Sequence, residues 1–143
     1  MTKLDAQTIK RALTDAGVEV YRTQEGEIHV AERIRLHIMD SGIRVKIAER
    51  LKVLFTARSQ QSDFPNHGAD VLFNKVRDSV GTAAGTRGYV EAGAVTTQVT
   101  DPVDKTKILD VWHEVTYEKE AQNVDSLVDE VRWALDVEKY IAS

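Results

Sequence analysis

Cysteine is absent from the 143 residues of this chain. Disulfide bonds, thiolate metal ligands and cysteine nucleophiles are therefore excluded, and the composition fits a reducing compartment. The chain also has no apolar run near the roughly 20 residues of a membrane span, and its polar first residues lack the apolar stretch of a secretory signal. We therefore expect a cytoplasmic protein with no membrane partner.

Recognisable catalytic motifs are missing as well. The histidines do not form an H-E-x-x-H pair or another metal-binding spacing; they are His29, His37, His67 and His113. We interpret His113, whose strand neighbours are apolar, as a hydrogen-bonded core residue. His67 and Asp70 could form an acid–base pair at a helix start, but a role for Asp70 or Asn66 at the helix N-terminus is the simpler interpretation. The sequence predicts no metal site and no catalytic residue.

Residues 81–88 are rich in glycine, alanine and threonine but do not match a phosphate-binding loop. Such a loop needs Gly-Lys-Ser/Thr opening a helix, or Gly-x-Gly-x-x-Gly after a strand. Here a helix is expected before the segment and a strand after it. We therefore interpret the segment as a flexible connector, a hinge or a frayed helix end, and we predict no cofactor.

An alternation of apolar and basic residues over residues 33–55 is the strongest structural signal. A period of two places alternate side chains on opposite faces of a β-strand. We expect a hairpin with its turn at Asp40-Ser41-Gly42 and a long second strand over residues 43–57. The apolar face, which we expect to face the helices, contains Ile34, Leu36, Ile38, Val45 and Ile47. The opposite, cationic face contains Arg33, Arg35, His37, Arg44, Lys46, Arg50 and Lys52.

This cationic face has more than one interpretation. The first 58 residues carry 11 basic and 8 acidic side chains, and the rest carry 8 and 15, within a net charge of −4. The face could bind an acidic protein surface, including that of a second copy, or nucleic-acid phosphates. Nucleic acid ranks lower because the chain is acidic overall and the face lacks aromatic residues that stack on bases. Alternatively, Glu32, Glu49 or the acidic second half neutralises these charges within the fold.

Trp112 is a further candidate for a contact surface. It alternates with His113 and therefore shares its strand face with the acidic residues Asp110 and Glu114. A large aromatic residue on a polar face is typical of an interface, although it could also lie at the margin of the core. The predicted interaction surface comprises the seven cationic-face residues and Trp112.

The remaining pattern predicts three helices with strands between them. Asp5 can cap a first helix that ends at Gly17, and Asn123 can cap a last helix over residues 124–141. A middle helix is expected over residues 69–80, after a polar loop at 59–68. Further strands are expected over residues 18–22, 27–31, 89–100 and 108–118, with turns at 24–26 and 101–104.

Strands grouped between helices favour the α+β class, with helices packed on one face of an antiparallel sheet. We expect a single domain over residues 1–143, with about five strands in the order α-β-β-β-α-β-β-α. The other face of such a sheet is solvated, as the alternation at residues 33–55 requires.

This order of elements resembles that of the YbjN-like and type III secretion chaperone-like families. The resemblance covers the first helix with Leu13, Ala16 and Gly17, the strand pair around Gly26, the 33–55 hairpin, the helix with Phe73 and Val76, the 95–117 strands and the 124–141 helix. It implies a small, often dimeric α/β sandwich of a kind that binds protein segments, and it transfers no functional residue.

We therefore expect a non-catalytic protein-interaction module, chaperone-like or regulatory, that associates with itself as a homodimer. A nucleic-acid-associated protein that binds through the cationic hairpin is the alternative. A small hydrolase or transferase centred on His67 and Asp70 ranks third.

Overall fold

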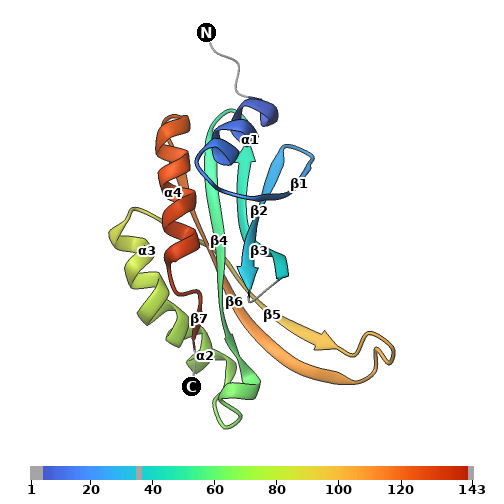
Figure 1. Ribbon diagram of the computed structural model, residues 1–143. Coiled ribbons are helices and arrows are strands. Elements are labelled where there is room, and N and C mark those ends of the chain that lie inside the picture. The colour runs from blue at the N-terminus through green and yellow to red at the C-terminus, as the bar shows by residue number, and fades with distance from the viewer. Residues whose placement is uncertain (1–4, 35–36, 142–143) are drawn as a thin grey trace. The chain divides into compact units, whose positions relative to one another are not determined.

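The computed structural model of the protein describes residues 5–34 and 37–141, with side chains except at 33, 34 and 37–41. The fold is α+β with one sheet of seven strands (Figure 1), which confirms the predicted class. The predicted number of about five strands and the predicted order α-β-β-β-α-β-β-α were both wrong, because the strand expected over residues 43–57 is divided between two strands and Tyr140–Ile141 forms a further short strand. The strands are β1 (Val20–Gln24), β2 (Glu27–Ile34), β3 (His37–Ile47), β4 (Leu51–Gln60), β5 (Val90–Thr100), β6 (Ile108–Ala121) and β7 (Tyr140–Ile141).

The strands hydrogen-bond in the order β1-β2-β3-β4-β6-β5, and β7 pairs with β4 outside this path. The pairs β1–β2, β2–β3 and β3–β4 are antiparallel, whereas β7 runs parallel to β4. The chain forms two compact units, one of Met1–Phe55 and Glu118–Val137 and one of Thr56–Tyr117 and Glu138–Ser143. No helix within the described ranges is both long and apolar enough to cross a bilayer.

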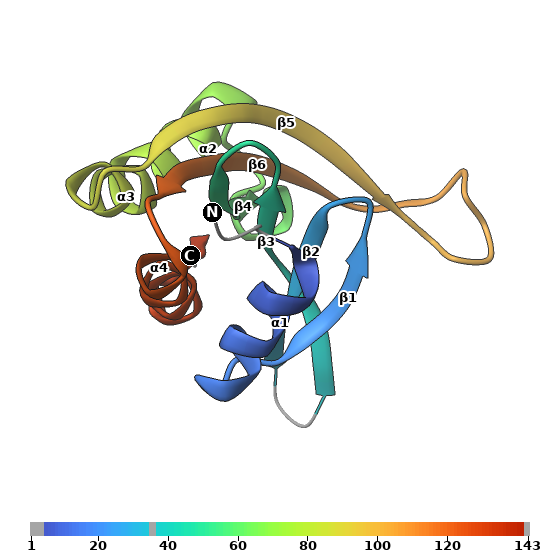
Figure 2. The same ribbon diagram turned by 90° about the horizontal axis from the view of Figure 1, so that it is seen from above.

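In the first unit, α1 (Ala6–Asp15) and α4 (Val124–Asp136) pack on β1, β2 and β3. Figure 2 shows both helices on the same side of β2 and β3. Both predicted N-caps are confirmed, since Asp5 accepts from the Thr8 N–H at 2.7 Å and Asn123 accepts from the Ser126 N–H at 2.8 Å. The fully buried core between these elements includes Ile9, Leu13, Ile28, Val45, Leu127 and Val131.

The predicted turn at Asp40-Ser41-Gly42 was wrong, because these residues lie inside β3. Gly42 has a φ of 78°, and the β2–β3 register shifts where His29 and Ala31 pair with Arg44 and Asp40. Two steps along β2 therefore correspond to four along β3, which is a β-bulge. After the bulge, the predicted orientation of the side chains is confirmed: Val45, from the apolar face, is fully buried, and the Lys46 side chain, from the cationic face, is 46% exposed. The predictions for Ile34, Leu36 and Ile38 lie outside the side chains that the structure describes.

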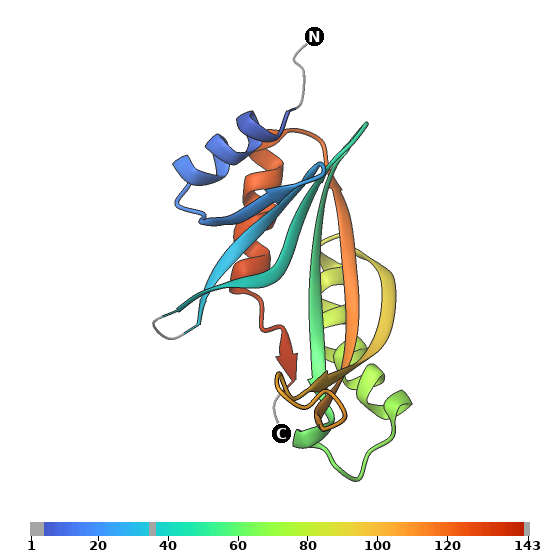
Figure 3. The ribbon, with the colours of Figure 1, turned by 90° about the vertical axis from the view of Figure 1, so that its right-hand side faces the viewer.

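In the second unit, the strands pair in the order β7-β4-β6-β5. A helical run packs on them, formed by α2 (Ala69–Val76), a π-helical turn at Arg77–Gly81 and α3 (Thr82–Thr86) (Figure 3). Residues 81–86 are therefore helical; they continue the helical run, so the default prediction of a flexible connector or hinge was wrong, and the alternative of a helix end is nearer to the structure. The prediction that the last helix reaches residue 141 was also wrong. α4 ends at Asp136, and Tyr140 instead pairs with Arg58 of β4.

Two glycines of this helical run make a matched test of its packing. A Cβ at Gly81 would lie 2.7 Å from the hydroxyl of Tyr117, which is 4% exposed, whereas a Cβ at Gly85 would meet nothing within 4 Å. Overpacking costs about 1–3 kcal/mol, and alanine is favoured over glycine in a helix by about 1 kcal/mol. We expect Gly81→Ala to lower the free energy of unfolding by about 1 kcal/mol and Gly85→Ala to raise it by up to about 1 kcal/mol. Urea unfolding measures both, and equal shifts would contradict the packing of Gly81 on Tyr117.

Candidate functional site

The predicted interaction surface is only partly within the described structure. Arg35 lies outside the described residues, and only the backbone is described at Arg33 and His37. The other four basic residues, Arg44, Lys46, Arg50 and Lys52, belong to the first unit, where β3 meets β4. We call these four residues the cationic surface.

Lys46 and Lys52 are direct neighbours across the β3–β4 ladder. Like charges in directly opposite positions destabilise a sheet. A carboxylate lies beside each of them, because Lys46 Nζ is 3.8 Å from Glu27 Oε1 and Lys52 Nζ is 3.9 Å from Glu118 Oε1. The repulsion between the two lysines is therefore offset inside the fold.

Glu27 compensates more than one cation. It pairs with Lys46 across the β2–β3 ladder, and its Oε2 lies 3.8 Å from Arg44 Nη1 and 3.6 Å from His29 Nε2. Its side chain is 27% exposed, so its carboxylate meets the Arg44 and Lys46 cations at the edge of solvent. Each exposed pair contributes only about 0–1 kcal/mol, yet together they lower the positive potential of the cationic surface.

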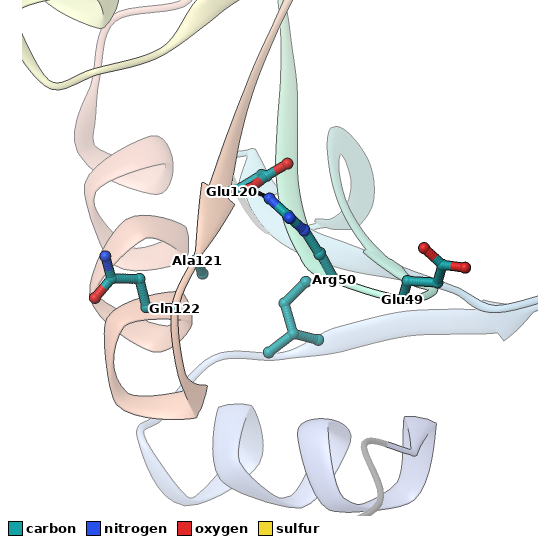
Figure 4. A pocket seen from close by; sticks show the side chains of 6 residues that line it. Glu49, Arg50, Glu120, Ala121 and Gln122 are labelled. Atoms are coloured by element: carbon teal, nitrogen blue, oxygen red, sulfur yellow. Dashed lines mark hydrogen bonds and ion pairs between the residues drawn. The ribbon is translucent and has the colours of Figure 1, made fainter.

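Arg50 completes the surface at the turn between β3 and β4. Its Nη1 donates to Glu120 Oε2 at 2.9 Å, and Figure 4 shows the guanidinium extended toward Glu120 while Glu49 points away from this pair. The pair lines an open depression of about 300 Å³ together with Gln122. A neighbouring depression of about 520 Å³ is lined by Lys46 and Lys52. Glu49 and Glu120 line both depressions.

The cationic surface is therefore a surface of mixed charge. Each of its four cations lies within 4.0 Å of a carboxylate, from Glu27, Glu118 or Glu120. Two of these three carboxylates come from the second half of the chain, as the interpretation of internal neutralisation anticipated. The sequence analysis named Glu32 and Glu49 but missed Glu27, which only the β2–β3 register places opposite Lys46.

Trp112 lies in the second unit and is half-buried. The Arg58 guanidinium stacks on it, 3.7 Å from the ring centroid, and lies 4.7 Å from the Tyr140 ring centroid. Arg58 also donates to the Tyr140 hydroxyl at 3.4 Å. A cation between two aromatic rings is stabilised by their quadrupoles. Part of the Trp112 surface is thus covered by the protein's own arginine, which the sequence analysis did not single out.

The interpretation of His113 as a hydrogen-bonded core residue is confirmed. The residue is 2% exposed, and its Nδ1 and Nε2 lie 3.0 Å from Thr96 Oγ1 and Gln61 Oε1. The Phe73 ring meets the imidazole edge to face, with centroids 5.3 Å apart. The two ring nitrogens therefore bond to β5 and to the turn after β4, while the ring itself packs on Phe73 of α2.

A carboxylate near this network is held by the loop that follows β4. Burial alone would raise the pKa of Asp110, but hydrogen bonds from the Ser62 hydroxyl and from the Val111 and Ser62 N–H groups hold that pKa below its usual value. Ser62 Oγ donates to Asp110 Oδ2 at 2.7 Å. The charged form of Asp110 therefore anchors the loop to β6.

The third-ranked alternative invoked His67 and Asp70. Both residues are exposed, and the structure places His67 against Phe64, with ring centroids 5.7 Å apart. The N-cap position of α2 is Gly68, and Asp70 lies in the first turn of the helix, as the simpler interpretation expected. Within residues 5–34 and 37–141, no cluster of three or more His, Asp or Glu side chains is arranged to hold a metal ion.

The outer edge of β5 is a surface that the sequence analysis missed. β5 ends the strand order of the sheet, and Figure 2 shows it as the outer strand beside β6. Residues 90–98 are all exposed, including Val90 at 61% and Val95 at 58%. The only charged residue of β5, Glu91, accepts hydrogen bonds from Arg77 Nε at 2.8 Å and Nη2 at 3.1 Å, which hold its pKa below the usual value. An edge strand presents unpaired N–H and C=O groups that can pair with another strand.

No protein-family model, curated protein or solved structure matches the chain. The neutralised cationic surface and the open edge of β5 are therefore the features on which a functional proposal can rest.

Proposed function

We propose that this protein is a non-catalytic protein-interaction module of the cytoplasm, chaperone-like or regulatory and self-associating. The resemblance of its element order to the YbjN-like and type III secretion chaperone-like families is part of this proposal. The observation that carries it is the β5 edge, which is exposed over residues 90–98 and has no strand beside it in the described part of the chain.

Strand addition is the mode of binding that such an edge supports. An extended segment pairs with the free N–H and C=O groups, which supply affinity, while exposed side chains on alternate positions supply selectivity. β5 is rich in valine and threonine, which favour extended structure, and it contains no lysine, arginine or proline that would oppose pairing. The partner on this basis is a protein segment in an extended conformation.

Nucleic-acid binding is the alternative function, and the internal ion pairs of the cationic surface count against it. Phosphate binding draws its affinity from cations that release counterions. Here Arg44, Lys46, Arg50 and Lys52 already have carboxylates within 4.0 Å, so an incoming phosphate competes with Glu27, Glu118 and Glu120. A partner with an acidic surface would meet the same competition.

We expect the purified chain to bind labelled single-stranded and duplex oligonucleotides only weakly at physiological salt, with a dissociation constant of about 10⁻⁴ M or weaker. Fluorescence anisotropy measures this binding. Lys46→Glu and Lys52→Glu together should change it little. Submicromolar binding that this double variant abolishes would favour the nucleic-acid function instead.

The proposed function is tested with Val95→Lys, which places a charge in the middle of the β5 edge, and Val103→Lys as its control. Val103 is 95% exposed in the turn after β5, so the control makes the same chemical change outside the edge. Tagged wild-type and variant chains are incubated with extract of the native host, and captured proteins other than the chain itself are quantified and rebound in purified form.

We expect the wild type and Val103→Lys to retain the same partners, and Val95→Lys to lose them. Urea unfolding checks that both variants are folded, since substitutions at such exposed positions change stability by about 0.5 kcal/mol or less. Equal capture by all three chains would refute binding through the β5 edge.

A further inference from the structure

We infer that the segment occupying the β5 edge is β5 of a second copy, paired antiparallel about a two-fold axis at Val95. This inference rests on the proposed function and names its partner. β5 is an eleven-residue strand, Val90–Thr100, within the second unit. It ends the strand order, so no other strand in the described part of the chain pairs with its outer side.

The two edges of the sheet differ in the protection they carry. β1, at the other end of the strand order, has only five residues, contains Arg22, and has a register shift between Val20 and Arg22. Short length, charge and bulges are the devices that prevent edge-to-edge pairing. β5 is twice as long and its only charge is Glu91, which Arg77 already binds. The unprotected edge is therefore β5.

The charge distribution of β5 selects antiparallel pairing with a second copy. With Val95 on the two-fold axis, Glu91 of each copy lies opposite Val99 of the other. The two Glu91 carboxylates are then eight residues apart, about 27 Å along the strands, which exceeds the Debye length of about 8–10 Å. In-register parallel pairing would instead bring the two Glu91 side chains next to each other, which is unfavourable.

The same register matches the uncharged side chains with one another. Val95 faces Val95, Ala94 faces Thr96, and Gly93 faces Thr97. The Val95 pair on the axis forms once and places two apolar β-branched side chains side by side, and the two-fold axis forms each of the other pairs twice. The strand is therefore complementary to itself, and the exposed Val95 gains a partner.

The first experiment measures the mass of the wild-type chain by sedimentation velocity over a range of concentrations. A single pair of strands is a small interface, so we expect a monomer–dimer equilibrium in the micromolar range. Val95→Lys puts two like charges opposite each other at the axis and should weaken dimerisation about tenfold or more, whereas Val103→Lys should leave it unchanged. A monomeric wild type at all concentrations, or unaltered dimerisation of Val95→Lys, would overturn the inference.

The second experiment tests the register and uses the absence of cysteine from the chain. Val95→Cys places two thiols opposite each other at the axis, where a disulfide can form. Gln98→Cys is the matched control, since its two thiols would be six residues apart, about 20 Å. We expect oxidation to cross-link the first variant as a dimer but not the second. Cross-linking of Gln98→Cys in preference to Val95→Cys would overturn pairing about Val95.

These outcomes separate the inference from the proposed function. If the wild type is monomeric but Val95→Lys still loses its host partners, the β5 edge binds another protein and only the second copy is refuted. If the wild type dimerises through Val95 but captures no other protein, self-association stands and binding of further partners is refuted.

Discussion

Replacing His113 by alanine is expected to lower the free energy of unfolding by about 3 kcal/mol. The imidazole is 2% exposed and packs edge to face on Phe73, so its removal leaves a cavity under the helical run. It also leaves Gln61 Oε1 and Thr96 Oγ1, each 3.0 Å from a ring nitrogen, without that partner. A cavity and the loss of two part-buried hydrogen bonds add in the same direction. Urea unfolding monitored by circular dichroism measures the change.

Two further substitutions separate the contributions of His113. Thr96→Val removes one of the hydrogen bonds and no ring, so it should cost only about 1 kcal/mol. His67→Ala removes an exposed imidazole and should change stability by about 0.5 kcal/mol or less. If His113→Ala costs no more than His67→Ala, then His113 is not the core residue that its burial indicates.

Replacing Phe55 by alanine is expected to cost about 3–5 kcal/mol. Phe55 is fully buried in the first unit, and its ring meets Trp133 of α4 edge to face with centroids 5.7 Å apart. The substitution removes a large side chain that joins β4 to α4, together with an aromatic pair. The half-buried Phe64, which lies in the loop after β4, provides a control; Phe64→Ala should cost about 1 kcal/mol.

The two tryptophans allow this effect to be followed locally. Trp133 belongs to the first unit and Trp112 to the second, so Trp112→Phe leaves a fluorescence probe of α4 alone. In that background, Phe55→Ala should shift the unfolding midpoint reported by Trp133 to lower urea. An unchanged midpoint would mean that Phe55 does not hold α4 to β4.

Local signals in the sequence predicted those features that depend on neighbouring residues. Asp5 and Asn123 cap their helices because a short side chain before the first turn can reach its free N–H groups in any fold. The turn at residues 24–26 between β1 and β2 was predicted from its glycine, and the structure confirms it. Glu25 and Gly26 both adopt the positive φ that tight hairpin turns use. The burial of Val45 beside the exposed Lys46 followed from the alternation alone.

The errors arose where a local pattern is compatible with two structures. Asp40-Ser41-Gly42 is typical of a turn, but Gly42 at a φ of 78° also suits a β-bulge, and only the pairing of β3 with β2 decides between them. Tyr140 fits the apolar stripe of a helix, but it forms a strand because residues 58–59 of β4 offer a free edge. Pairing over such sequence separations leaves no signal in a single sequence.

The sequence by itself determined the α+β class, the helix starts, the alternating faces and the exclusion of cysteine chemistry, because each depends on residue type and near neighbours. The tertiary structure decided which charges remain available and which strand lies at an edge. Glu27, Glu118 and Glu120 reach the cationic surface only through strand register, and β5 is open only because the strand order ends there. Both properties depend on which strands become neighbours, and that is set by long-range packing.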